Sequence, residues 1–177
     1  MDNKYKSFSK SINDYSDLLV IAISAALEAG KAILEIYHSD DIETEIKGDN
    51  SPLTNADKAS HNVIISYLKN TAIPVISEEG RNIPYSERKD WDKLWIIDPI
   101  DGTKEFIQRN GEFTVNIALI ENKRPILGVI FVPEKGDLYF STSSFGAFKV
   151  NVDISNYDTI SLIESSNKLL LPSLPFL

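Results

Sequence analysis

The segment "FTVNIALIENKRPILGVIFVPEKGDLYFST", residues 113–142, contains three runs typical of β-strands, at 113–120, 124–132 and 137–142. A fourth run, "GAFKV", follows at 146–150. Only a few turn residues separate successive runs, and connections this short join antiparallel neighbours. The sequence therefore predicts an antiparallel meander.

Two segments upstream are expected to form helices on this sheet. Apolar residues recur every three or four positions over 14–37 and again over 55–70, which is typical of amphipathic helices. Gly30 interrupts the first pattern, so we expect a tight crossing with another helix there. The polar residues 38–52 predict a connection or short hairpin, and short strands are expected at 74–77 and 94–97. Helices gathered on one side of an antiparallel sheet make an α+β layered fold.

The composition limits the classes of function. The 177 residues have the size of one domain, and a hydrophobic content of 42% suffices for a core. A net charge of −8 argues against nucleic acid as the main partner. There are no cysteines, so disulfides and thiolate metal sites are excluded. The polar N-terminus and the lack of an apolar run of about 20 residues predict a cytoplasmic protein without a transmembrane segment.

The motif "WIIDPIDGTKEFI", residues 95–107, predicts a metal and phosphate site. A buried strand ends in Asp98 and Asp101, which should project to one place. Gly102 permits an unusual backbone conformation, and Thr103 is expected to be the N-cap of a short helix whose first N–H groups would favour a phosphate. Carboxylates beside such an anion site require divalent cations between them, and hard oxygen ligands indicate magnesium.

Two further acidic clusters support this interpretation. "SEEG" places Glu78 and Glu79 at the end of another predicted strand, and "DNSPLTNADK" places Thr54 and Asp57 at a helix start. Each cluster alone is also typical of an ordinary turn or helix cap. Three clusters at element ends together favour metal-assisted phosphoryl hydrolysis.

"DNSPLTNAD", "SEEG" and "WIIDPIDGT" resemble the three N-terminal motifs of the lithium-sensitive, magnesium-dependent phosphatases that include inositol monophosphatase and fructose-1,6-bisphosphatase. The continuation "KEFIQRNGEFTVNIALI" is similar to the 3′(2′),5′-bisphosphate nucleotidase branch, the CysQ proteins. The resemblance implies the N-terminal part of that fold and hydrolysis of adenosine 3′,5′-bisphosphate to AMP and phosphate. An inositol monophosphatase and a non-catalytic, metal-binding remnant stay open as alternatives.

The resemblance also implies roles for single residues. Glu78, Asp98 and the backbone carbonyl of Ile100 would hold one magnesium ion, and Asp98 and Asp101 would share a second, so two or more ions are expected. The Thr103 hydroxyl, backed by Asp57, would orient the attacking water.

The substrate contacts implied by the resemblance are Glu78, Ile100, Asp101, Gly102 and Thr103. Glu79 is expected near the ligands and Lys104 near a nucleotide phosphate, although both are equally typical of surface residues. His38 and His61 lie in helical stretches without a second imidazole nearby, and neither is expected to be a ligand or a catalytic residue.

The resemblance runs to about residue 161, so we expect a phosphatase domain at 1–161 and an aberrant or truncated tail at 162–177. Relatives in this family carry a further α/β region with a Trp-Asp-x-x-Ala-Gly motif, which does not occur here. On this basis the second α/β region is expected to be missing and the chain at best weakly active. A homodimer and peripheral association with the inner face of the cell membrane are further expectations.

Overall fold

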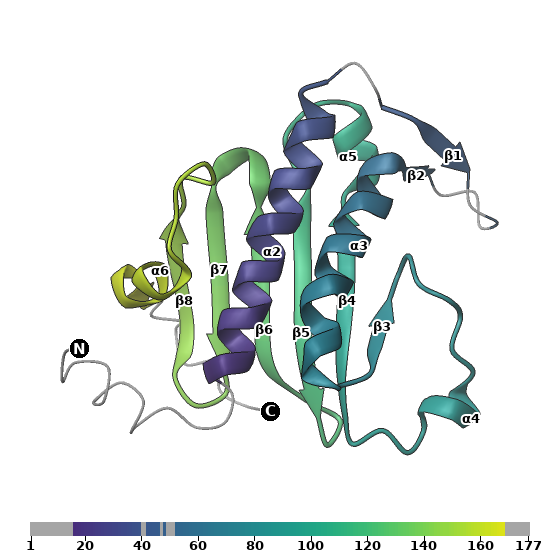
Figure 1. The fold of residues 1–177 in the computed structure, drawn as a ribbon, viewed down its shortest axis with the longest axis vertical. Helices are drawn as coiled ribbons and strands as arrows, with labels where there is room; N and C mark the ends of the chain where they lie inside the picture. The colour runs from purple at the N-terminus through teal and green to yellow at the C-terminus, as the bar shows by residue number, and fades with distance from the viewer. Residues whose placement is uncertain (1–15, 40–41, 47, 49–51, 169–177) are drawn as a thin grey trace, which may run out of the picture.

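The computed structural model describes residues 16–39, 42–46, 48 and 52–168. Two helices, α2 (Ser16–Tyr37) and α3 (Asn55–Leu68), lie side by side in front of a seven-stranded sheet in the order β3-β4-β5-β6-β7-β8-β9 (Figure 1). The predicted α+β layered fold is therefore confirmed, and both long helices begin or end close to the predicted residues.

The strands of the large sheet are β3 (Val75–Ser77), β4 (Lys93–Asp101), β5 (Thr114–Glu121), β6 (Arg124–Val132), β7 (Asp137–Thr142), β8 (Gly146–Asn151) and β9 (Asn167–Lys168). A separate antiparallel pair, β1 (Thr44–Ile46) and β2 (Pro52–Thr54), forms the hairpin expected before α3. The shorter helical elements are η1 (Lys69–Thr71), α4 (Tyr85–Arg88), α5 (Thr103–Ile107), η2 (Pro133–Lys135) and α6 (Thr159–Ser165).

Strands β5 to β8 form the predicted antiparallel meander, and β4 pairs antiparallel with β5 beside it. Strand β3 differs, because it pairs parallel to β4, which the sequence analysis did not predict. A parallel neighbour requires a crossover connection, and the segment containing α4 supplies it. Strand β4 also continues past the predicted end at Ile97 to Asp101, with a register shift between Asp98 and Asp101. Such an irregularity turns side chains away from the regular alternation.

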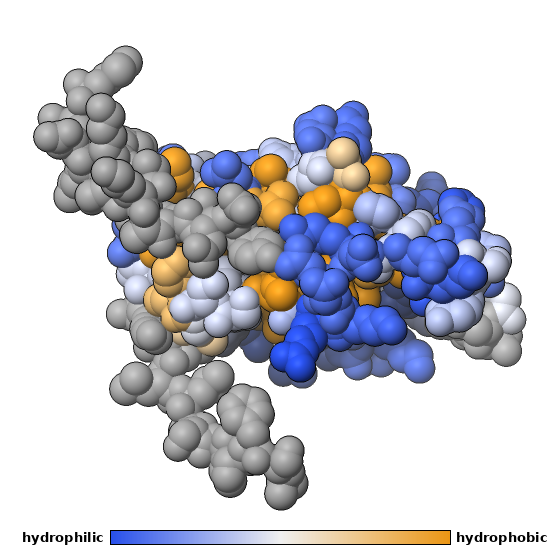
Figure 2. Space-filling model, turned by 90° about the horizontal axis from the view of Figure 1, so that it is seen from below, coloured by the Kyte–Doolittle hydropathy of each residue, from blue (hydrophilic) through white to orange (hydrophobic). Residues whose placement is uncertain are grey.

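The core lies between the two helices and one face of the sheet. Strand residues such as Trp95, Ile117 and Phe131 are fully or almost fully buried there, together with Ile23 and Leu27 of α2. Seen from below, hydrophobic residues gather in the middle of this end of the molecule, and hydrophilic residues cover the side that carries α4 (Figure 2). Among the described residues, no helix is both long and apolar enough to cross a membrane.

Gly30 allows a close approach, but its partner differs from the prediction. A Cβ built at Gly30 would lie 2.4 Å from Cε1 of Phe131 on β6. The glycine therefore lets α2 press onto the sheet, and the predicted tight crossing with another helix at this position is wrong.

Candidate metal centre at the ends of two strands

The parallel pairing of β3 and β4 brings two acidic strand ends together. Ser77 lies opposite Ile97 in the register, and the backbone N–H of Glu78 donates to the Ile97 carbonyl over 3.2 Å. Glu78 consequently follows its strand at the same level at which Asp98 follows Ile97. The family resemblance implied that Glu78 and Asp98 lie together, and the parallel ladder places the two strand ends side by side.

Asp98 is a half-buried carboxylate in an unfavourable environment. Burial first, and then the negative charges of Glu78 and Asp101, raise the pKa of Asp98 to about 7. A hydrogen bond with Glu78 and the charge of Glu79 act in the same direction. Within the described part of the chain, the buried Oδ1 atom of Asp98 has no hydrogen-bond partner. Such an atom costs free energy unless a ligand reaches it.

Asp101 lies beyond the register shift and is exposed. Its Oδ2 accepts a hydrogen bond of 3.2 Å from Nδ2 of Asn116 on β5, whose own Oδ1 accepts from the Thr114 hydroxyl, also over 3.2 Å. Asn116 also pairs with Asp98 across the ladder. The sheet thus fixes Asp101 from the side, which leaves its other oxygen available to a cation.

The donor set fits a hard cation. In the described residues, no three His, Cys, Asp or Glu side chains form a ready-made cage. A cation at Asp98 would therefore draw Glu78 and Asp101 inward, with the Ile100 carbonyl as a further oxygen. A divalent ion would pair with the buried, unpartnered oxygen of Asp98. It would also offset the repulsion among the acids.

Asp57 lies in a different environment, at the start of α3. It is fully buried, and its Oδ2 accepts from the Thr54 N–H over 2.8 Å and from the Thr54 hydroxyl over 2.5 Å. The Asp57 N–H donates in return to the Thr54 hydroxyl over 3.3 Å, which completes a capping box. The Thr103 hydroxyl reaches Oδ1 of Asp57 over 3.3 Å. The structure therefore joins Asp57 and Thr103 as predicted.

Thr103 is not the N-cap of α5, so that prediction is wrong. Gly102 occupies the cap position with a φ of 99°, and a Cβ there would lie 2.9 Å from the Glu112 carbonyl. Because Thr103 is already inside the helix, its hydroxyl points to Asp57 and to the Ile100 carbonyl, each over 3.3 Å. The predicted unusual backbone conformation at Gly102 is confirmed, since residues with a Cβ atom rarely adopt a positive φ of this size.

Comparison with known proteins identifies the family. Residues 14–174 match the description "Inositol monophosphatase family". The chain belongs to the inositol monophosphatase family. Phosphatases of this family are metal-dependent.

Among curated relatives, a 3′(2′),5′-bisphosphate nucleotidase CysQ from Shigella flexneri is 49% identical over 117 residues, which covers 64% of this chain and 47% of the relative. The CysQ nucleotidase of Buchnera aphidicola is 41% identical over 139 residues, covering 77% and 52%. The crystal structure of CysQ from Bacteroides thetaiotaomicron superposes with a TM-score of 0.79 at 46% identity, covering 92% of this chain and 61% of that one. The chain thus spans about half of the length of the curated relatives that it matches.

Within this family member, the remaining predicted residues have plain surroundings. Lys104 is exposed on α5, and His38 pairs with Glu134 through Nε2 and Oε2, 3.3 Å apart. His61 is partly buried on α3, and burial lowers its pKa.

Sequence reasoning missed two polar residues that support the site. Asn116 holds Asp101, and the fully buried Ser60 donates its hydroxyl to the Pro99 carbonyl over 2.8 Å. Both are polar residues on otherwise apolar faces or strands, which was the available signal. Their partners depend on the register of β4 and β5 and on the contact between α3 and β4. Neither can be derived from the sequence.

Proposed function

We propose that this chain carries the metal-binding carboxylates of a magnesium-dependent phosphatase that converts adenosine 3′,5′-bisphosphate to AMP and phosphate. The observation that carries the proposal is the buried, unpartnered oxygen of Asp98 among other acids. Family membership supports the reaction class, and the identity of 49% to a protein named 3′(2′),5′-bisphosphate nucleotidase supports this substrate over others.

In this proposal, the oxygens of Glu78, Asp98, Ile100 and Asp101 hold two or more magnesium ions. Bound magnesium would lower the pKa of a water molecule and neutralise the charge of the phosphate oxygens. Asp98 is central, since burial and neighbouring charges raise its pKa and its buried Oδ1 atom has no hydrogen-bond partner among the described residues. Asn116 restrains Asp101, so that this ligand enters the site from the side of β5.

Asp57 and Thr103 act on the water in this proposal. Asp57 accepts the Thr103 hydroxyl proton in a hydrogen bond, which leaves the lone pairs of the Thr103 oxygen directed to a water hydrogen. The buried capping box fixes Asp57, so one of the two acceptors within reach of the Thr103 hydroxyl is held in place. The backbone N–H groups of Gly102 and Thr103 would contact the scissile phosphate, beside the ends of the metal-binding acids.

The test is phosphate release from adenosine 3′,5′-bisphosphate with and without magnesium. We expect magnesium-dependent release that falls by 10²–10³ in Asp98→Asn, because removing one preorganised electrostatic contact commonly costs that much. The control is Asp90→Asn, which removes the same charge from an exposed acid beyond α4 and should leave the rate unchanged. Equal rates in the wild type and Asp98→Asn would contradict the proposal.

Inositol 1-phosphate tests the alternative substrate in the same assay. Faster release from this ester than from the nucleotide would favour an inositol monophosphatase. Magnesium binding without release from either ester would favour the non-catalytic alternative. The homodimer, the cytoplasmic location and the peripheral membrane association stay predictions, and the described residues offer no observation in favour of the last.

A further inference from the structure

His61 is connected to the acidic turn that follows β3. Its Nδ1 atom lies 2.8 Å from the Ser77 hydroxyl, close enough for a hydrogen bond in either tautomer of the ring. The same hydroxyl oxygen accepts from the backbone N–H of Glu79 over 3.2 Å, and the Gly80 N–H donates to the Ser77 carbonyl over 3.1 Å. Ser77 thus organises the turn that presents Glu78 and Glu79, and His61 contacts Ser77 from α3.

The neighbouring residues of α3 make equivalent contacts with the second strand end. Asp57 accepts from Thr103 after β4, and Ser60 donates to the Pro99 carbonyl inside β4. Asp57, Ser60 and His61 have the spacing i, i+3 and i+4, which places them on one face of a helix. One face of α3 therefore contacts both acidic strand ends.

We propose that His61 is a positioning residue that holds the turn after β3, and with it Glu78 and Glu79, through the Ser77 hydroxyl. The link to magnesium rests on the proposed function, whereas the ordering of the turn does not. When Glu78, Asp98 and Asp101 are all ionised, their like charges repel one another across the gap between the turn and β4. The hydrogen bonds at Ser77 hold the turn in place from the side of α3. The carboxylates therefore stay close enough together to bind one cation.

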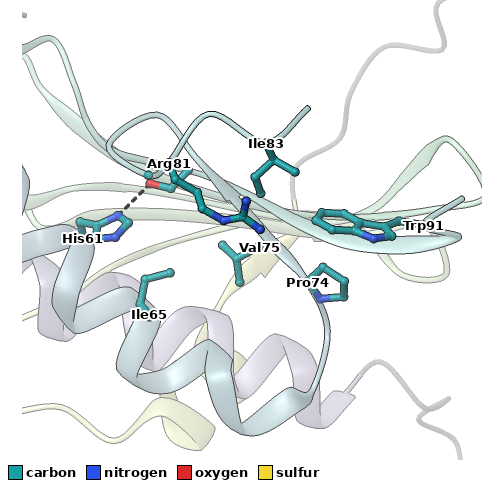
Figure 3. Close-up of a pocket in the computed structure, with 9 residues that line it drawn as sticks. His61, Ile65, Pro74, Val75, Arg81, Ile83 and Trp91 are labelled. Carbon is teal, nitrogen blue, oxygen red and sulfur yellow. Dashed lines mark hydrogen bonds between the residues drawn. The ribbon is translucent and has the colours of Figure 1, made fainter. Parts of the chain in front are cut away.

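A histidine that only fills space would not need this contact. The distinction is testable because His61 lines a pocket of about 400 Å³ that contains Ser77, Gly80 and Arg81 (Figure 3). In this view the hydrogen bond from the imidazole to Ser77 is seen at one side of the pocket. A small molecule can therefore reach the space that a shortened His61 leaves, and free imidazole is the matching probe.

The experiment compares four variants of the 177-residue chain: His61→Ala, His61→Asn, Ser77→Ala and His38→Ala. Asparagine places a polar atom close to the position of Nδ1. His38, which directly follows α2, is the matched histidine, and its ion pair among the described residues is with Glu134. Two quantities are measured: hydrogen exchange of the Glu79 amide in the metal-free chain, and the magnesium dissociation constant. Circular dichroism and the unfolding temperature identify variants that fail to fold.

We expect His61→Ala and Ser77→Ala to weaken magnesium binding about 10-fold, in the range found when partners outside the direct ligands are removed. The Glu79 amide should exchange at least several-fold faster in both. The magnesium dissociation constant of His61→Asn should stay within about 3-fold of the wild-type value. Free imidazole should restore magnesium affinity and slow exchange of the Glu79 amide in His61→Ala but not in Ser77→Ala. Only the first variant retains the hydroxyl that imidazole would contact. His38→Ala should match the wild type.

Unchanged Glu79 exchange in a folded His61→Ala chain would overturn this inference. A loss restored neither by asparagine nor by imidazole would also overturn it, since that result indicates packing alone. If the wild type binds no magnesium, the proposed function fails, and the exchange of the Glu79 amide still decides the role of His61.

Discussion

Asp57 and Asp98 are two acids with opposite surroundings. Asp57 is fully buried, and both of its oxygens accept hydrogen bonds, from Thr54 and from Thr103. Asp98 is half-buried, and its Oδ1 has no partner in the described part of the chain. The protein satisfies the first carboxylate by itself, whereas the second is stabilised only by a proton or by a cation. In the proposed site, this difference separates a structural acid, Asp57, from a metal ligand, Asp98.

The largest effect on folding should come from Asp57→Ala. The variant removes the capping box and leaves the buried Thr54 groups without their acceptor, so we expect a loss of about 3 kcal/mol in the free energy of unfolding. Urea unfolding of the metal-free chain measures it. Asp57→Asn, which keeps one acceptor oxygen, is the control and should lose less. A loss below that of an ordinary surface substitution would show that Asp57 is not satisfied as described.

The second effect is the pH dependence due to Asp98. Its pKa is about 7 in the folded chain and ordinary in the unfolded one, so the folded state binds more protons between about pH 4 and pH 7. The stability of the metal-free chain should therefore fall as the pH rises through this window, by about 2 kcal/mol after solvent screening is allowed for.

Asp98→Asn should flatten this part of the profile, because the amide does not ionise. Unfolding temperatures at a series of pH values, in the presence of a chelator, check the expectation. A wild type and an Asp98→Asn variant with parallel profiles would mean that the acids are further apart in solution than the structure places them.

A smaller effect is expected from Ser60→Ala. Ser60 is fully buried, and its hydroxyl donates to the Pro99 carbonyl. Removing this hydroxyl should lower the free energy of unfolding by about 1 kcal/mol. The contact joins α3 to the strand that carries Asp98, and the variant should therefore also weaken magnesium binding slightly. Ser66→Ala, an exposed serine of the same helix that bonds only within the helix, is the matched control. Equal unfolding free energies for the two variants would argue against the link.

The smallest change in stability should come from Thr103→Val. The side chain keeps its shape and loses a hydroxyl whose two hydrogen-bond distances are both 3.3 Å. We therefore expect the free energy of unfolding to fall by about 0.5 kcal/mol. Phosphate release should nevertheless fall by about 10² or more if this hydroxyl orients the water. Serine at this position should retain most of the activity. A fall in activity that only follows the fall in stability would remove Thr103 from the proposed chemistry.

The sequence was sufficient for the meander and the acidic cluster. Short turns allow only antiparallel neighbours, so the pairing of β5 to β8 could be derived from their connections. Asp98 and Glu78 could be placed at strand ends because apolar runs stop directly before them. The roles of single ligands came from a family resemblance, and no observation here tests them, so they stay predictions.

The remaining features depend on contacts between distant residues. The parallel pairing of β3 was not predictable, because a longer connection permits either direction. Ser60 and Pro99 are 39 positions apart and His61 and Ser77 are 16 apart, and helical periodicity does not say which polar residue meets which strand. The tight helix crossing predicted at Gly30 was wrong, because the neighbour of this glycine, Phe131, is set by how α2 lies on the sheet. The predicted boundary at residue 161 stays a prediction, and residues 169–177 of the predicted tail lie outside the described residues.

The most direct test of the central claim is a calorimetric titration of the chain with magnesium at neutral pH, in the wild type, Asp98→Asn and Asp90→Asn. The account predicts saturable binding in the wild type and in Asp90→Asn, and a loss of about 100-fold or more in Asp98→Asn, since the acid with the unpartnered buried oxygen is the one that needs the cation. Magnesium affinity that is the same in Asp98→Asn and the wild type would contradict it.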